Sequence, residues 1–169
     1  MDSKEFGLVA AQQLFQVEDL HYGFWNKGEE ATLGNWKEAQ KAHTDFLFKY
    51  IFEYTKNKDQ SRLLDIGCGV GITTRKLLDL GYKVDGLVPY PWMAKYASKI
   101  TSDFRDNDKG EIYECKFENF ISIPKRDKKY QLVFFSESFQ YVKLIKAFNV
   151  LEKILDKNGI IIIFDFFKK

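Results

Sequence analysis

The sequence has little cysteine, little proline and no long apolar run, and each shortage excludes a class of protein. Its two cysteines, Cys68 and Cys115, are too few for a disulfide framework and lack the spacing of a metal site. Three prolines and the lack of any Gly/Ser-rich stretch give no sign of an internal linker, so we expect one domain over residues 1–169. No apolar run approaches the ~20 residues that cross a bilayer, so no membrane span is expected.

The charge balance and the N-terminus narrow the classes further. A total of 26 Lys and Arg against 24 Asp and Glu gives a net charge of +2, too mild to indicate a nucleic-acid partner. The first residues lack a charged and then apolar export signal, which predicts a cytoplasmic protein. The 16 Phe and 9 Tyr fit either an apolar pocket or an ordinary core rich in phenylalanine.

Hydrophobic periodicity divides the chain into two parts. Residues 36–54 place apolar side chains three and four positions apart, which predicts an amphipathic helix, and residues 2–20 follow a weaker version of this pattern. His43 lies on the apolar stripe, where a core histidine with satisfied polar atoms is a simpler interpretation than a ligand or a base. We expect residues 1–57 to form a helical cap and residues 60–169 to form an α/β core.

Beyond residue 60, predicted strands and helices alternate. The strands are expected over residues 62–66, 82–88, 111–117, 130–136 and 160–166, and the helices over residues 72–80, 92–100 and 142–155. Continuous runs of Ile and Phe favour a sheet that is covered on both faces, and the alternation favours parallel strands. Ligands of such sheets bind at the carboxyl ends of the strands, where the strand order reverses.

The end of the first predicted strand carries the clearest functional signal. Residues 63–71 read LLDIGCGVG, and glycines at alternate positions let the backbone turn tightly and approach a ligand. The helix that follows begins with free N–H groups suited to an anion. Ile72 stands where a dinucleotide fingerprint needs glycine, and Asp65 is a poor neighbour for a pyrophosphate. An acid beside a helix N-terminus fits a zwitterionic amino acid that carries a sulfonium.

This segment resembles the first motif of the Rossmann-like, S-adenosylmethionine-dependent methyltransferases. Residues 81–88, 130–138 and 155–161 resemble the second, fourth and fifth strands of that family. Residues 21–25, HYGFW, are similar to a segment that closes over the cofactor in relatives acting on small or lipid-like acceptors. The resemblance implies a doubly wound, mainly parallel α/β sheet of about five strands under an N-terminal helical lid.

The resemblance also implies a function. The chain is expected to use S-adenosyl-L-methionine, to release S-adenosyl-L-homocysteine and to methylate a small-molecule acceptor. The alternative is a catalytically silent methyltransferase-like domain that acts as a binding or partner subunit. Val88 and Lys116 favour that alternative because they stand where the family usually carries acids for the ribose and the adenine, and neither can accept those hydrogen bonds.

The family's cofactor site can be carried over residue by residue. Asp65 and the glycine-loop backbone would hold the methionine part, whereas Met93 would pack either on the adenine or in the core. Phe117 would meet the ring through its backbone N–H and stack with its side chain. The expected cofactor-binding residues are Tyr22, Trp25, Asp65, Gly67, Cys68, Gly69, Gly71, Val88, Met93, Phe117 and Ser136.

No catalytic residue and no metal ligand is assigned from the sequence. Methyl transfer from a sulfonium is an in-line displacement that positioning and desolvation accelerate, so no nucleophilic side chain is required. Candidate bases around the expected strand ends are His21, Tyr22, Glu137 and Tyr141. Each has a structural alternative: lid packing for the first two, a helix cap for Glu137 and core packing for Tyr141.

The sequence stops soon after the fifth predicted strand. The family's sheet usually continues with a helix and an antiparallel pair of strands, so strands six and seven are expected to be missing. The apolar fifth strand would then be a sheet edge that associates readily. We therefore expect either a fragment of a longer protein or a homodimer or partner chain that pairs through this edge.

Overall fold

Five parallel strands form the centre of the computed structural model, which describes residues 6, 7, 10, 14, 21–105, 108–123 and 128–166. The strands lie in the order β3-β2-β1-β4-β5, and every neighbouring pair is parallel. Their bounds are Arg62–Ile66 for β1, Lys83–Val88 for β2, Ile112–Glu114 for β3, Tyr130–Ser136 for β4 and Leu155–Phe164 for β5. This is the expected doubly wound, Rossmann-like sheet, and its strand order reverses between β1 and β4.

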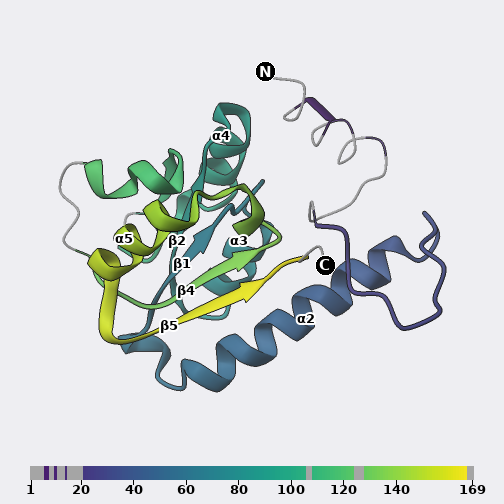
Figure 1. Ribbon diagram of the computed structural model, residues 1–169, viewed down its shortest axis with the longest axis horizontal. Helices are drawn as coiled ribbons and strands as arrows, with labels where there is room; N and C mark the ends of the chain where they lie inside the picture. Colours follow the sequence, from purple (N-terminus) through teal and green to yellow (C-terminus); the bar gives the residue numbers. More distant parts are fainter. Residues whose placement is uncertain are drawn as a thin grey trace.

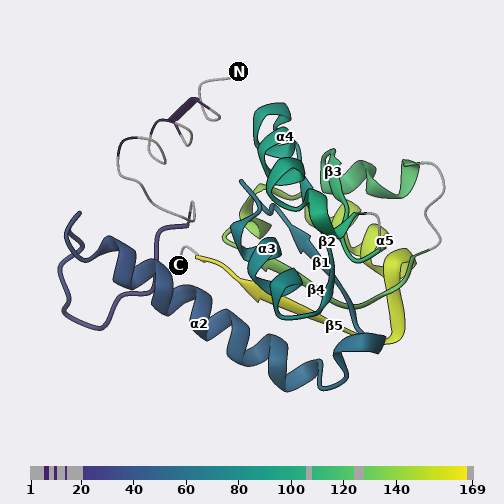
Figure 2. The same cartoon turned by 180° about the vertical axis from the view of Figure 1, so that it is seen from behind.

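Helices cover both faces of the sheet (Figures 1 and 2). The α-helices are α2 (Trp36–Tyr54), α3 (Ile72–Asp79), α4 (Pro91–Ile100) and α5 (Leu144–Ile154). Short 3-10 helices span Lys58–Gln60, Ser102–Phe104, Phe117–Ser122 and Phe139–Tyr141. Helix α2 runs alongside β5 in both views, and α5 lies on the opposite side of the sheet from α3. None of the helices among the described residues combines the length and the apolar character needed to cross a membrane.

The hydrophobic core follows this layering. Leu47 and Ile51 of α2 pack in one cluster with Leu77 of α3 and with Leu63 of β1, all of them essentially inaccessible to solvent. A second cluster on the other face joins α5 to the sheet and to the 3-10 helix Phe117–Ser122. Helix α2 was expected to belong to a cap. Its apolar side chains instead pack directly into the α/β core.

The observed bounds differ from the predicted ones by one residue in β2, α3 and α4, and by more in three other elements. The third strand ends at Glu114, and the apolar residues after it belong to the 3-10 helix Phe117–Ser122. The last helix begins at Leu144 rather than at residue 142. The fifth strand spans Leu155–Phe164 rather than residues 160–166, and its register with β4 shifts between Tyr130 and Leu132.

Strand β5 lies at the edge of the sheet and is covered on one face only. Ile160, Ile162 and Phe164 pack against the cluster that contains α2. Ile161 and Ile163 point to the other face and are 36% and 38% exposed. The expected coverage of both faces is therefore wrong for this strand, although its apolar composition is the same as that of a buried one. The helix predicted over residues 2–20 lies outside the described residues, apart from the four isolated positions named above.

Candidate functional site

The glycine loop connects β1 to α3 at the point where the strand order reverses. Gly67, Gly69 and Gly71 all have left-handed backbone conformations, with φ of 82°, 55° and 84°. The backbone N–H groups of Gly67 and Cys68 both donate to the carbonyl of Leu87, at 2.7 and 3.1 Å. The loop is thus held against the end of β2 in a shape that residues with a Cβ rarely adopt.

Asp65 lies behind the loop rather than on its surface. Its side chain is almost fully buried, and one carboxylate oxygen accepts a 2.7 Å hydrogen bond from the hydroxyl of Thr74. Thr74 lies in the first turn of α3, so the bond fixes the start of that helix on β1. Burial, helped by the charge of Asp65, raises the pKa of the Cys68 thiol well above its ordinary value. Cys68 is therefore a protonated thiol rather than a nucleophile.

Three of the expected cofactor-binding residues meet in one apolar cluster beside the loop. Cys68, Val88 and Met93 are buried together, with exposed fractions of 9%, 2% and 1%. Tyr90 and Trp92 pack against this cluster and are only partly buried. Val88 ends β2 as expected, and its side chain is occupied by apolar contacts.

The remaining expected residues occupy three different places. Phe117 is buried in the core cluster on the α5 side and contacts Phe135 edge-to-face at 5.6 Å. Ser136 is the last residue of β4 and is partly buried. Tyr22 is 64% exposed and Trp25 is half-buried, both in the segment before α2. The carbonyl of Tyr22 accepts a 3.0 Å hydrogen bond from the indole of Trp36, which fixes this segment on α2.

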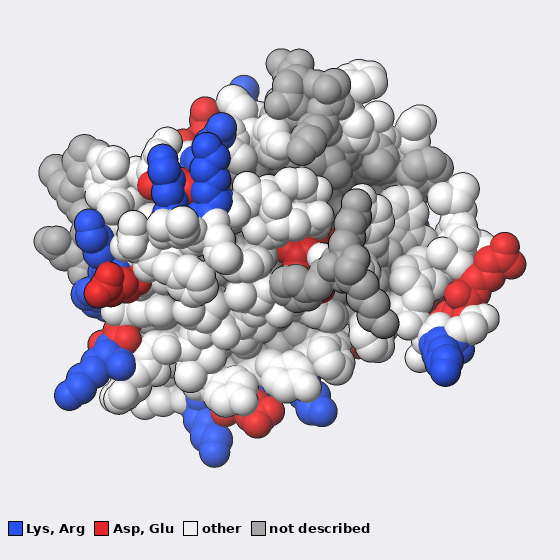
Figure 3. All heavy atoms as spheres, viewed as in Figure 1, with Lys and Arg blue, Asp and Glu red and all other residues white. Residues whose placement is uncertain are grey.

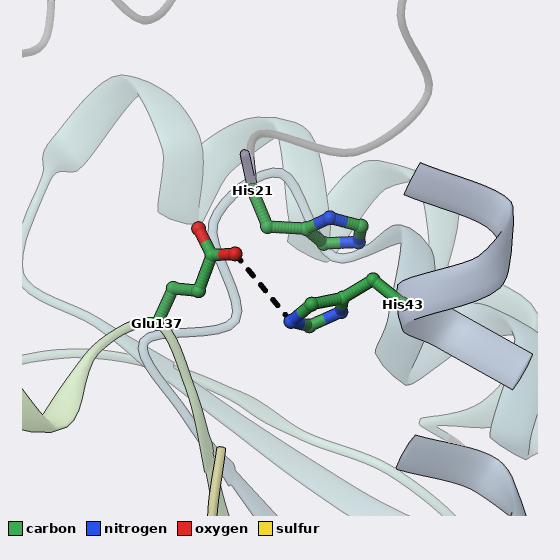
Figure 4. A group of neighbouring side chains, drawn as sticks. All are labelled: His21, His43 and Glu137. Atoms are coloured by element: carbon green, nitrogen blue, oxygen red, sulfur yellow. Dashed lines mark ion pairs between the residues drawn. The ribbon is translucent and has the colours of Figure 1, made fainter. Parts of the chain in front are cut away.

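A buried cluster of titratable side chains lies at the carboxyl end of β4 (Figure 4). Glu137 follows β4 directly, and its Oε2 accepts the backbone N–H of Tyr22 at 2.8 Å. Its Oε1 lies 3.4 Å from Nε2 of His43 on α2. The ring of His21 stacks on His43 with centroids 4.0 Å apart. Burial raises the pKa of Glu137, and the hydrogen bond from Tyr22 and the charge of His21 oppose this shift.

Sequence reasoning considered these three residues singly and did not bring them together. His21, His43 and Glu137 come from the segment before α2, from α2 itself and from the end of β4. No spacing along the chain links them, because their contact depends on how α2 docks on the sheet. The helix-cap alternative for Glu137 is wrong, since its carboxylate accepts the N–H of Tyr22 instead.

Aromatic side chains surround this cluster on the outside. Tyr22 and Phe166 meet edge-to-face at 5.7 Å, and both are more than half exposed. Tyr141 is 65% exposed, so core packing does not describe it. Partial burial, with Tyr22 and Asp165 close by, raises the pKa of the Tyr141 hydroxyl.

Comparison with known proteins gives a family model and several relatives. The family model described as a methyltransferase domain matches residues 36–168. A malonyl-[acyl-carrier protein] O-methyltransferase of Ilyobacter polytropus is 30% identical over 131 residues, which are 76% of this chain and 45% of the relative. The chain spans between about a third and a half of the length of the curated relatives that it matches.

Solved structures share the fold at lower identity. The geranyl diphosphate C-methyltransferase of Streptomyces coelicolor, in complex with Mg²⁺, geranyl-S-thiolodiphosphate and S-adenosyl-L-homocysteine, has a TM-score of 0.67 at 19% identity. The match covers 89% of this chain and 57% of that one. The [4+2]-cyclase SpnF has a TM-score of 0.66 at 16% identity, covering 95% of this chain and 60% of the cyclase. Because a cyclase shares it, the fold alone does not specify methyl transfer.

Proposed function

The chain belongs to the methyltransferase domain family, and we propose that it transfers a methyl group from S-adenosyl-L-methionine to a small-molecule acceptor. The observation that carries the proposal is the glycine loop at the switch point of the sheet. Gly67 and Gly69 are partly exposed between buried neighbours, and both have left-handed φ. Backbone without side chains is therefore presented to a ligand beside the start of α3.

The residues around the loop fit the parts of this cofactor. The backbone of Gly67, Cys68, Gly69 and Gly71 would hold the methionine part, with Asp65 fixing the loop from behind. Val88 and Met93 would face the adenosine from the apolar cluster. Tyr90 packs against the same cluster and would offer the ribose a hydroxyl group, which Val88 cannot. When bound, the cofactor supplies a methyl group on a positively charged sulfur. The chain's own part is to orient the two reactants and to exclude water.

The acceptor would lie beside Tyr22, at the carboxyl end of β4. The exposed aromatic rings of Tyr22, Tyr141 and Phe166 offer apolar contact there, which favours an acceptor with an apolar body. Tyr22 and Trp25 would close over the cofactor from the segment before α2. Two further residues complete the proposed set. Phe117 lies in the 3-10 helix on the α5 side of the sheet, and Ser136 is the last residue of β4.

We also propose that a second copy or a partner chain covers the edge of β5. Figure 3 shows few charged side chains over the centre of the face that carries α5 and β5. Ile161 and Ile163 on β5 are exposed there, and so are Leu144, Ile145 and Phe148 on α5. An exposed apolar edge strand is a template for association. Sedimentation tests this: association is expected, and a monomer at all concentrations would contradict it.

Calorimetric titration with S-adenosyl-L-homocysteine tests the proposed function. The wild type should bind one equivalent, and Gly69→Val should lose binding while it keeps its far-UV spectrum. Gly81→Val is a matched control, because Gly81 lies outside the loop, also has a positive φ, and an added Cβ there would meet nothing within 4 Å. Failure of the folded wild type to bind at millimolar ligand would contradict the proposal and favour a catalytically silent domain.

A further inference from the structure

The side chains of His21, His43 and Glu137 bring two imidazoles and a carboxylate together inside the protein (Figure 4). One donor atom from each residue lies within 4.8 Å of the other two. His21 and His43 are 8% and 2% exposed, and the side chain of Glu137 is 7% exposed. The sequence contains two histidines in all. The chain therefore gathers all of its imidazoles around one buried carboxylate.

The spacing between Glu137 and His43 is that of two ligands on one metal ion. Oε1 of Glu137 lies 3.4 Å from Nε2 of His43. A charge-assisted hydrogen bond between these groups would be shorter, at about 2.7–2.9 Å. Two ligand atoms that each lie about 2.0–2.1 Å from a tetrahedral ion are about 3.3–3.4 Å apart. The pair is thus too long for a strong hydrogen bond and has the separation that a shared ion requires.

The surrounding backbone holds the Glu137 carboxyl in this position. Its Oε2 accepts the N–H of Tyr22 at 2.8 Å, whereas Oε1 makes no hydrogen bond within the described part of the chain. Glu137 has a left-handed φ of 54°, and its backbone N–H donates to the carbonyl of Phe164 at 2.8 Å. A second contact of this kind orients the carboxylate ligands of metal sites. Strained residues such as Glu137 concentrate at functional sites.

His21 is the one ligand that has to turn. Its ring stacks on His43 with the two planes 24° apart, so the nitrogen lone pairs of the two rings lie in nearly parallel planes. Because the donor atoms are at most 4.8 Å apart, a movement of about 1.4 Å or less brings the His21 nitrogen to ligand spacing. Rotation about the side-chain bonds of His21 would turn and move the ring. It would loosen a 3.3 Å contact with the Thr44 hydroxyl, which is long for a hydrogen bond and therefore weak.

The donor set selects the kind of metal. Two imidazoles and a carboxylate suit Zn²⁺ and other first-row divalent ions. Mg²⁺ and Ca²⁺ prefer sites made of oxygen atoms alone and are poor occupants of this one. The carboxyl of Asp165 also acts on that of Glu137 as a like charge, and a divalent cation would balance both.

We propose that His21, His43 and Glu137 bind one Zn²⁺ or a similar first-row divalent ion. The inference goes beyond the proposed function and does not depend on it. The ion would join the segment before α2, α2 itself and the turn after β4, which are distant in sequence. It would therefore bind the folded chain in preference to the unfolded one and stabilise it. It would also fix the segment that carries Tyr22 and Trp25. Three protein ligands leave one position of a tetrahedral ion for a water molecule.

The first test is a calorimetric titration with Zn²⁺ of the full-length chain, without a histidine tag and after removal of metal with a chelator. One equivalent should bind with a Kd below about 1 μM, and the melting temperature should rise with Zn²⁺ concentration. Co²⁺ should give the visible absorption of a four-coordinate site. Weaker binding, or binding that does not saturate at one equivalent, would mean adventitious surface contacts and would overturn the proposal.

The second test removes one ligand at a time. His43→Phe keeps an aromatic ring between His21 and Phe164 and loses the donor nitrogen, and Glu137→Gln keeps the shape of the side chain without its charge. Each variant should keep its far-UV spectrum, bind Zn²⁺ at least roughly tenfold more weakly and lose the Co²⁺ absorption. Wild-type affinity in both variants would overturn the proposal.

Two controls locate the ion. Glu152→Gln changes an exposed carboxylate on α5, and Cys115→Ser removes a partly buried thiol that lies outside the cluster. Both should keep the wild-type Kd for Zn²⁺. Loss of binding in Cys115→Ser would place the ion at the thiol and overturn the proposal.

Nuclear magnetic resonance of the two histidine rings reports on the site without any substitution. Because His21 and His43 are the only histidines in the chain, one equivalent of Zn²⁺ should shift the ring-nitrogen signals of both. A shift of one ring alone, or of neither, would overturn the proposal even if the ligand variants do not fold. Failure of the wild type to bind S-adenosyl-L-homocysteine would contradict the proposed function and leave this inference standing.

Discussion

Ser138 and Gly67 touch so closely that no side chain fits between them. A Cβ atom placed on Gly67 would come within 2.9 Å of the Ser138 hydroxyl and closer still to its Cβ. The contact joins the turn after β4 to the loop after β1, across the switch point of the sheet. Two segments that are distant in sequence are thus fixed relative to each other where the cofactor and the acceptor are proposed to meet.

Gly67→Ala should therefore damage both stability and ligand binding. Its φ of 82° costs about 1–2 kcal/mol for a residue with a Cβ, and the overlap with Ser138 adds to this. We expect a loss of roughly 2–4 kcal/mol in the free energy of unfolding and at least a tenfold weaker Kd for S-adenosyl-L-homocysteine. Thermal denaturation and calorimetry measure the two effects.

Gly81→Ala is the matched control for the overlap. Gly81 has a similar φ of 92°, but an added Cβ would meet nothing within 4 Å. It should show only the backbone cost of about 1–2 kcal/mol, with ligand binding unchanged. Equal losses in Gly67→Ala and Gly81→Ala would mean that the contact with Ser138 has no effect of its own.

Val88→Asp should weaken the free protein and strengthen its response to the cofactor. Val88 is 2% exposed among apolar neighbours, so an aspartate there costs roughly 1–3 kcal/mol of folding free energy. If the ribose lies at the end of β2, its hydroxyls would donate to the new carboxylate and tighten binding. The measurement is the rise in melting temperature on adding S-adenosyl-L-homocysteine, which should be larger than for the wild type. Val88→Asn is the uncharged control. A smaller rise in melting temperature for Val88→Asp than for the wild type or for Val88→Asn would show that the ribose is held elsewhere.

The site illustrates which features the sequence can predict. The glycine loop was predictable because its residues are consecutive and the conformation that they need is local. The exposed edge at Ile161 and Ile163 was expected only from the resemblance, because a run of isoleucines by itself reads alike in a central strand and in an edge strand. The end of β3 was missed, since a short apolar run continues into a 3-10 helix without a change in pattern.

The buried cluster of His21, His43 and Glu137 lies at the other extreme. His21 and His43 meet because the segment before α2 folds back on that helix, where the side chain of Gln40 donates to the carbonyl of His21 at 2.8 Å. Glu137 joins them only through the docking of α2 on β5, which brings Phe164 against His43. These contacts depend on tertiary packing, and a single sequence carries no periodicity that reports it.

The stability of the wild type should fall as the pH rises above the ordinary glutamate pKa, because of Glu137. Burial raises the pKa of this carboxyl in the folded chain above its value of 4.5 in the unfolded chain. The folded state therefore keeps the proton longer, so the stabilisation is complete below the unfolded pKa and is lost as the pH rises through the folded pKa. Denaturant titrations at a series of pH values measure this effect.

Glu137→Gln isolates this contribution because glutamine does not ionise. The variant should lose the part of the pH dependence that lies between the two pKa values, whereas Glu152→Gln, at an exposed site, should keep it. A Glu137→Gln profile that runs parallel to the wild type over this range would show that the carboxyl is not perturbed by folding.

Asp85 should be essential to stability and irrelevant to the cofactor, although it lies on β2 close to Val88. Its fully buried carboxylate accepts from the guanidinium of Arg62 at 3.2 Å and from the hydroxyl of Tyr130 at 2.8 Å. Asp85→Asn leaves the guanidinium of Arg62, whose side chain is 10% exposed, paired only with the exposed Asp108 at 2.8 Å, so we expect a loss of about 2–3 kcal/mol in the free energy of unfolding. The control is Asp79→Asn in the exposed pair with Arg75, where about 1 kcal/mol or less is expected. In both variants the Kd for S-adenosyl-L-homocysteine should stay at the wild-type value below the melting temperature. A weakened Kd in Asp85→Asn alone would place this carboxylate in the cofactor site, contrary to the hydrogen bonds that occupy it.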